Sequence, residues 1–166
     1  MQPDLNLRYS IPDEEWARTA GMRWDNEAFP LYHCFFGHVH FTVGGEEVLE
    51  PAPFDISIAD LAVGLAEVLE GLQNVDTGIL RFQQSDDSLC VLFDVSGAKV
   101  NISHNLSSSR WTCTRDGMQR GIVEFVRHFS HAVALKIDRP FEWGDMQILR
   151  QFDAEESRGG GEGQPE

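Results

Sequence analysis

The chain has 166 residues, of which 42% are hydrophobic, with 11 Phe and 4 Trp. This length and composition predict a folded domain with a packed core and exclude a chain that is disordered throughout. The 27 acidic and 13 basic residues leave a net charge of −14. Such a charge disfavours nucleic acid and acidic lipid as partners, because it repels their phosphates.

The acidic residues are unevenly distributed along the chain. Residues 1–109 hold 17 acidic and 5 basic residues, residues 110–150 hold 5 and 7, and residues 151–166 hold 5 and 1. A basic surface on another protein is attracted to such an acidic region. We therefore expect the first two thirds of the chain to contact a basic protein partner.

The start of the chain is polar, and no run of about 18 apolar residues is present, which argues against a secretory signal and a membrane span. We expect a cytoplasmic protein. Its three cysteines fall in separate strand-like runs, where thiols are usually buried and reduced. These are Cys34, Cys90 and Cys113.

The predicted elements begin with a short strand over residues 5–9, where apolar and polar residues alternate. Ser10 is the predicted cap of a helix that carries Pro12 and three acids in its first turn and ends near Gly21. A longer strand follows over residues 32–43, with Phe35 on its apolar face and Cys34 on the histidine-bearing face.

A hairpin and a helix follow. Gly44 and Gly45 can adopt positive φ, so residues 46–49 are predicted to return antiparallel to the preceding strand. From Ser57 the apolar period becomes helical, with Ser57 and Asp60 as an approximate capping box and Gly71 at the end of the helix.

Three strands in succession, over residues 78–84, 89–95 and 99–103, are separated by short turn sequences and predict an antiparallel meander. A further strand over residues 110–114 precedes a long amphipathic helix over residues 116–137. No secondary structure is assigned to residues 141–152.

These elements together predict the α+β class. The expected architecture is a single domain over residues 1–152, with a mainly antiparallel sheet of about five to seven strands packed against two principal helices. Residues 153–166 are glycine-rich and acidic, and we expect a disordered tail there.

Two histidine pairs are candidate metal ligands. His38 and His40 lie two apart on one strand face, a spacing that suits two imidazoles on one ion, but no third ligand lies nearby in the sequence. His128 and His131 fall on the polar side of the long helix. We therefore expect solvent-facing histidines, with no metal and no cofactor.

The chain has no recognisable catalytic signature. It has no Gly-x-Ser-x-Gly elbow, and acids follow Gly44 and Gly45 where a phosphate-binding loop would lead into a helix with Lys. Asp86 and Asp87 form a solvated turn without a full calcium-loop pattern. A glycosidase-like carboxylate pair stays open, because it depends on three-dimensional separation. We predict no catalytic residue.

One resemblance bears on function. The phrase FDISIADLA at residues 54–62, the LRF of residues 80–82 and the strand over residues 89–95 resemble small bacterial proteins of the actinobacterial type. Some of these are classed with the immunity proteins of polymorphic toxin systems, including the WapI-associated group. The resemblance covers residues 35–137 and implies a non-enzymatic cytosolic protein that binds and blocks a cognate toxin domain.

Charge fits this expectation, because nuclease toxins hold phosphate in basic clefts that an acidic protein can occupy. The residues expected to contact the partner are acids of the hairpin, the first long helix and the meander turn. They are Glu46, Glu47, Glu50, Glu67, Glu70, Asp86 and Asp87.

Two other functions are consistent with the sequence. One is a small-molecule-binding domain or minor enzyme with a pocket between sheet and helices, walled by Trp111, Trp143 or Phe125. The other is an acidic subunit of a larger assembly, which would expose a contiguous apolar patch.

Overall fold

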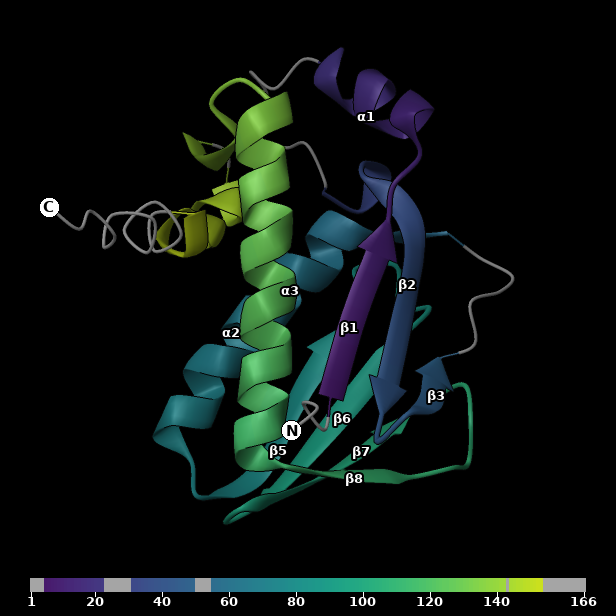
Figure 1. Ribbon diagram of the computed structural model, residues 1–166, viewed down its shortest axis with the longest axis vertical. Helices are drawn as coiled ribbons and strands as arrows, with labels where there is room; N and C mark the ends of the chain where they lie inside the picture. Colours follow the sequence, from purple (N-terminus) through teal and green to yellow (C-terminus); the bar gives the residue numbers. More distant parts are fainter. Residues whose placement is uncertain (1–4, 23–30, 50–54, 143, 154–166) are drawn as a thin grey trace, which may run out of the picture.

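The computed structural model describes residues 5–22, 31–49, 55–142 and 144–153. In these residues the chain forms two four-stranded antiparallel sheets and three α-helices (Figure 1), which confirms the predicted α+β class. The predicted tail and the side chains of Tyr32, Glu50 and Trp143 lie outside the described part of the chain.

The N-terminal sheet has the order β1-β2-β3, and a short β4 pairs with the first residues of β2. Gly44 and Gly45, with φ of 58° and 85°, form the predicted hairpin turn, and the return strand is confirmed. The strands are β1 (Leu5–Ser10), β2 (Phe36–Val43), β3 (Glu46–Leu49) and β4 (Ile56–Ser57).

Helix α1 (Asp13–Ala20) follows β1 and ends at Gly21 as predicted, but its cap differs. Pro12 occupies the N-cap position, and no side chain caps the helix, so the assignment of Ser10 as the cap was wrong. Ser10 instead extends β1 and pairs with His38.

Strand β2 begins four residues later than predicted. Leu31–His33 form a 3-10 helix, η1, and Phe35 has φ of +57°, a left-handed conformation that interrupts extended structure. This break turns Cys34 into the core, whereas the sequence had placed it on the histidine face.

Helix α2 (Ile58–Asn74) begins as predicted, because the Ser57 hydroxyl accepts a hydrogen bond from the Asp60 amide at 3.2 Å. Its end was predicted too early. Gly71 lies inside the helix, where a Cβ would come within 2.8 Å of the Leu80 side chain. The absent side chain at Gly71 therefore lets α2 lie close to β5.

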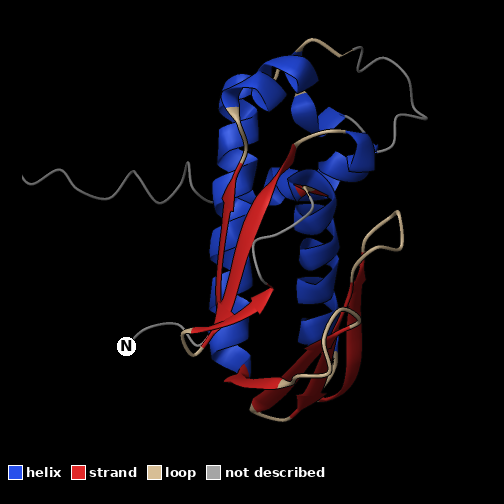
Figure 2. Ribbon diagram, turned by 90° about the vertical axis from the view of Figure 1, so that its right-hand side faces the viewer, coloured by secondary structure: helices blue, strands red, loops and turns tan. Residues whose placement is uncertain are grey.

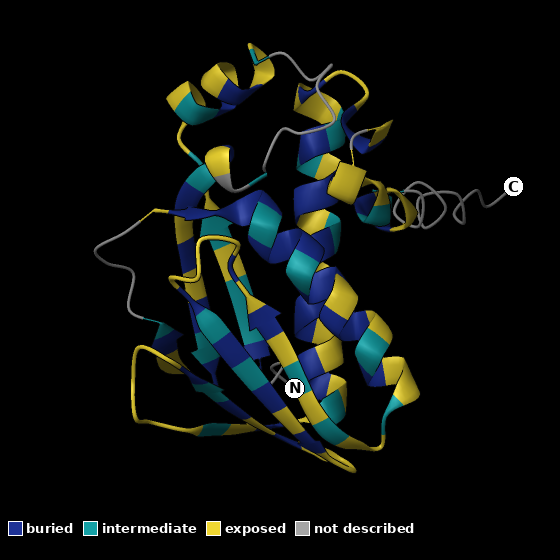
Figure 3. Ribbon diagram, turned by 180° about the vertical axis from the view of Figure 1, so that it is seen from behind, coloured by how far each residue is buried: buried dark blue, intermediate teal, exposed yellow. Residues whose placement is uncertain are grey.

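The C-terminal sheet has the order β5-β6-β7-β8, in which each strand pairs with the next along the chain. The predicted meander and the strand after it are confirmed to within two residues at each end. Figure 3 shows how buried and exposed residues alternate along these strands. The strands are β5 (Thr77–Gln83), β6 (Cys90–Ser96), β7 (Lys99–His104) and β8 (Trp111–Thr114).

Helix α3 (Arg115–Lys136) confirms the predicted long helix, and the Thr114 hydroxyl caps its first turn. Beyond it, the unassigned segment contains two 3-10 helices, η2 (Pro140–Glu142) and η3 (Gly144–Leu149). Met146 and Leu149 of η3 are fully buried, so this segment is part of the core.

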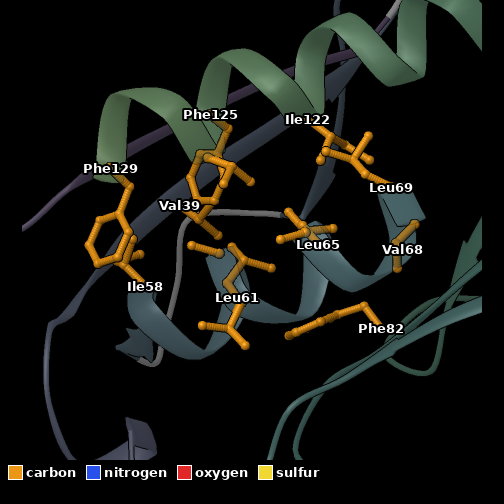
Figure 4. Close-up of a cluster of buried hydrophobic side chains, with 14 of the residues drawn as sticks. Val39, Ile58, Leu61, Leu65, Val68, Leu69, Phe82, Ile122, Phe125 and Phe129 are labelled. Carbon is orange, nitrogen blue, oxygen red and sulfur yellow. The ribbon is translucent and has the colours of Figure 1, made fainter. Parts of the chain in front are cut away.

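The core forms where the inner faces of both sheets meet α2. In Figure 2, β1 and β2 lie on the left, the C-terminal sheet lies at the lower right, and α2 is between them. Figure 4 shows Leu61 and Leu65 of α2 between Phe125 of α3 and Phe82 of β5. Ten residues of α2 are buried, which agrees with a helix enclosed on most sides.

Helix α3 lies along the free edge of β1 (Figure 1). A Cβ at Gly121 would overlap the backbone carbonyl of Leu5, so only glycine allows this approach. Tyr9 of β1 packs its ring edge-to-face on Phe125 and Phe129 of α3, with centroids 5.7 Å apart in both pairs. The helix thereby covers a strand edge that would otherwise be open.

A buried histidine joins the two sheets. His104 Nε2 of β7 lies 2.8 Å from the Val48 carbonyl of β3, and His104 Nδ1 accepts a hydrogen bond from the Leu106 amide at 3.1 Å. The ring also stacks on Trp111 with centroids 5.5 Å apart. Both hydrogen bonds require the neutral tautomer with its proton on Nε2.

Candidate functional site

Four carboxylates gather on one flank of α2. Glu67 and Glu70 are exposed on adjacent turns, and Asp60 of the same helix and Asp145 of η3 lie near enough to act on Glu67. Within the described residues, none of the four forms an ion pair with a basic side chain. We call Asp60, Glu67, Glu70 and Asp145 the α2 acidic face.

The pKa of Glu67 is raised above its ordinary value. Partial burial is the largest cause, followed by repulsion from Asp145, Glu70 and then Asp60. The sequence places these charges together without a compensating cation from the described residues. The neighbouring carboxylates therefore disfavour the ionised form of Glu67 in the isolated protein.

The β5–β6 turn continues this face. Ser85 donates its amide and its hydroxyl to the two carboxylate oxygens of Asp60, at 2.9 and 2.7 Å, which fixes the turn to the first turn of α2. Asp86 and Asp87 follow directly and are exposed. The structure thus brings the predicted acids of the turn and of α2 to the same side.

Asp86 and Asp87 also shape the turn. Asp86 accepts hydrogen bonds from the Ser88 hydroxyl and amide at 2.6 and 3.0 Å, and these bonds lower the pKa of Asp86. Asp87 accepts one from Gln83 Nε2 at 2.6 Å. Both carboxylates keep their charge exposed while their oxygens hold the turn.

The hairpin acids are not part of this face. Glu46 and Glu47 are exposed on β3, which lies to the right in Figure 1, whereas the C-terminal half of α2 lies to the left. Glu50 lies outside the described residues. The six predicted partner residues that the structure describes therefore fall into two separate groups, Glu46 and Glu47 on β3, and the acids of α2 and the β5–β6 turn.

Sequence reasoning missed two members of the α2 acidic face. Asp60 was assigned to the capping box and to the polar side of the helix but not to the partner surface, although its spacing of seven from Glu67 places both on the same helix face. Asp145 lies in the segment to which no structure was assigned, so no sequence signal pointed to it.

A separate groove runs over the seam between β1 and α3, with a volume of about 760 Å³. One wall comes from the outer face of the N-terminal sheet and the other from α3. Of the three predicted pocket walls, Phe125 lines this groove, Trp111 stacks on His104 elsewhere, and Trp143 lies outside the described residues. The groove residues used below are Asn6, Arg8, Thr42, Glu124, Phe125 and His128.

Three of the four histidines considered as metal ligands contact other side chains of the described chain. His38 lies 3.5 Å from Asp55, His128 contacts Tyr9, and His131 lies 3.5 Å from Asp153. Within the described residues there is no group of three ligand-type side chains that could hold a metal ion.

Cys34, Cys90 and Cys113 belong neither to the α2 acidic face nor to the lining of the groove. Cys34 is fully buried, and burial raises the pKa of its thiol to about 12, so the thiol stays protonated. Large exposed apolar residues of the described chain are scattered over β5, the loop after β7 and the end of α3, and they do not form one patch. They are Ile79, Leu106 and Leu135.

Comparison of this chain with protein-family models, curated proteins and solved structures gives no match. Among the described helices, none combines the length and apolar character needed to cross a membrane.

Proposed function

We propose that this protein is a non-enzymatic acidic binding protein that docks a basic protein on its α2 acidic face. The kind of partner that fits is a nuclease-like toxin domain, which an immunity protein would bind and block in the cytoplasm. The observation that carries the proposal is the convergence of Asp60, Glu67, Glu70 and Asp145 with no ion-pair partner from the described residues.

The physical reason is complementarity. Like charges that face one another raise the free energy of the free protein, and Lys or Arg side chains from a partner would relieve this repulsion. The net charge of −14 would also speed encounter with a basic surface. Both effects weaken as salt screens the charges.

The test uses immobilised full-length protein as bait for a lysate of the source cells, followed by purification of the retained protein. Its affinity is then measured by calorimetry at low and high salt. We expect a basic protein whose binding weakens with salt, and we expect a Glu67→Gln/Glu70→Gln/Asp145→Asn variant to bind at least about tenfold more weakly.

The matched control is Glu46→Gln/Glu47→Gln, which removes two charges from β3 and should bind the partner like the wild type. Equal binding by the α2 variant and the wild type would refute the proposed surface. Recovery of a bound metabolite with no basic protein would refute the function.

A further inference from the structure

We infer that the groove between β1 and α3 binds a small zwitterion, an amino acid or a short peptide, with Arg8 and Glu124 holding its two opposite charges. This site is independent of the proposed function, because no residue of its lining comes from α2, η3 or the β5–β6 turn.

Two opposite charges line the groove without meeting. Arg8 is exposed on β1 and Glu124 is exposed on α3, and neither has a hydrogen bond or ion pair with another residue of the described chain. A simple anion in the groove would be repelled by Glu124, and a simple cation by Arg8. A ligand that carries an ammonium and a carboxylate group satisfies both.

The sheet wall supplies polar groups in a fixed arrangement. Asn6 and Thr42 are cross-strand partners, and Arg8 follows Asn6 by two residues, so all three project from the same outer face of the sheet. An amide, a hydroxyl and a guanidinium thus lie side by side. Arg8 can bind a carboxylate through two parallel N–H groups, while Asn6 and Thr42 can bind a peptide group.

The helix wall carries Glu124 and His128 one turn apart, with Phe125 between them. His128 is oriented by Tyr9, whose hydroxyl lies 3.0 Å from Nδ1 and whose ring packs on the imidazole at 5.3 Å. Burial raises the pKa of Tyr9 to about 12, so its hydroxyl keeps a proton to donate to Nδ1. An imidazole that accepts this proton at Nδ1 carries its own proton on Nε2, where it can donate to a ligand oxygen.

The size of the groove suits such a ligand. Its volume of about 760 Å³ lies inside the range of pockets that hold small molecules. The open shape leaves room for more than one residue of a peptide.

The test is a nuclear magnetic resonance titration of the full-length, ¹⁵N-labelled protein with each common amino acid and with dipeptides of alanine and each amino acid. We expect at least one of these probes to shift the amide signals of residues 6–9 and 124–128. Arg8→Gln and Glu124→Gln should each weaken its binding about tenfold.

Two analogues of the same probe, each lacking one charge, show which charge contacts which residue. The analogue with its carboxylate converted to an amide should bind the wild type and Arg8→Gln equally. The analogue with its ammonium group acetylated should bind the wild type and Glu124→Gln equally. Arg81→Gln on β5 and Glu142→Gln on η2 are matched controls that should bind the unmodified probe like the wild type.

The inference is overturned if no probe shifts the groove amides at millimolar concentration. It is also overturned if either analogue binds the wild type as tightly as the unmodified probe does. Neither result bears on docking at the α2 acidic face, which is tested with a basic protein.

Discussion

The two sheets contain the same number of strands but are assembled differently. In the C-terminal sheet every strand pairs with its neighbour in the chain through a short connection. In the N-terminal sheet, β1 pairs with β2, although α1 lies between them in the chain. The other edge of β1 is covered by α3, which comes more than a hundred residues later. The first sheet therefore depends on long-range contacts, whereas the second is specified mainly by local turns.

This difference separates the two candidate sites as well. The zwitterion groove lies over the long-range seam between β1 and α3, so its geometry depends on how closely the helix approaches the strand. The α2 acidic face is built from one helix, one 3-10 helix and an adjoining turn. Mutations at the seam should therefore affect the groove and the stability of the protein together.

The largest expected effect is at Gly121. In Gly121→Ala the new Cβ overlaps the Leu5 carbonyl, a backbone atom that cannot rotate away, so α3 must shift from β1. We expect a loss of about 2 kcal/mol in the free energy of unfolding, measured by urea denaturation. The control is Gly71→Ala, where the new Cβ meets the flexible end of Leu80. Because alanine favours helix, this control should be neutral or slightly stabilising, and equal losses in both variants would contradict the comparison.

The next effect concerns the link between the sheets. His104→Leu removes the hydrogen bonds to the Val48 carbonyl and from the Leu106 amide, and leaves the buried carbonyl without its partner. We expect a loss of about 1.5 kcal/mol in urea denaturation and faster amide exchange in β3. His40→Leu, at an exposed position of β2, should stay close to the wild type. Unchanged exchange in β3 would show that His104 does not join the sheets.

A smaller effect is expected where α1 joins β2. Glu15 accepts hydrogen bonds from Arg18 at 2.5 and 2.8 Å and from the Phe36 amide at 3.1 Å. Glu15→Gln should lower the free energy of unfolding by about 1 kcal/mol at neutral pH.

The effect of Glu15→Gln should also depend on pH. Its hydrogen bond with Arg18 is the largest cause that lowers the pKa of Glu15. The stabilisation is therefore present above the ordinary pKa and is lost as the pH falls through the lowered value in the folded protein. The free energies of unfolding of the wild type and the variant, measured by urea denaturation from neutral to acidic pH, should converge at the acidic end. A difference that stays constant with pH would contradict this role of Glu15.

The smallest effect has the opposite sign. Because the pKa of Glu67 is raised, its ionised form is disfavoured by folding, and this penalty appears as the pH rises through the raised value. Glu67→Gln should therefore stabilise the protein by about 0.3 kcal/mol at neutral pH and lose this advantage in acid. Thermal and urea denaturation measure this gain, and the control variant Glu46→Gln should not show it. A Glu67→Gln variant that is less stable than the wild type would argue against the repulsion.

The sequence predicted the local features well. Gly44 and Gly45 located the hairpin and Ser57 located the start of α2, because turn and cap chemistry acts within a few residues. It did not predict the positive φ of Phe35 or the helical continuation past Gly71. Both depend on residues that are distant in the chain, since Phe35 packs on Trp16 and Phe129 and Gly71 lies against Leu80.

In the candidate sites, too, local groupings could be predicted and long-range ones could not. Glu67 and Glu70 could be grouped from their helical spacing, but Asp145 joins them only through the packing of η3 on α2. The groove between β1 and α3 unites residues more than a hundred positions apart, and among its lining residues only Phe125 had been proposed as a pocket wall. The pattern of a single chain does not contain such contacts.

The docking role of the α2 acidic face is tested most directly by titrating the ¹⁵N-labelled protein with a lysine hexapeptide at low salt. Shifts of the backbone amides should concentrate at residues 60–70, 85–88 and 144–147, and they should disappear when salt is added. Shifts concentrated on Glu46 and Glu47 of β3, or spread evenly over every exposed acid, would contradict a dedicated binding surface on α2.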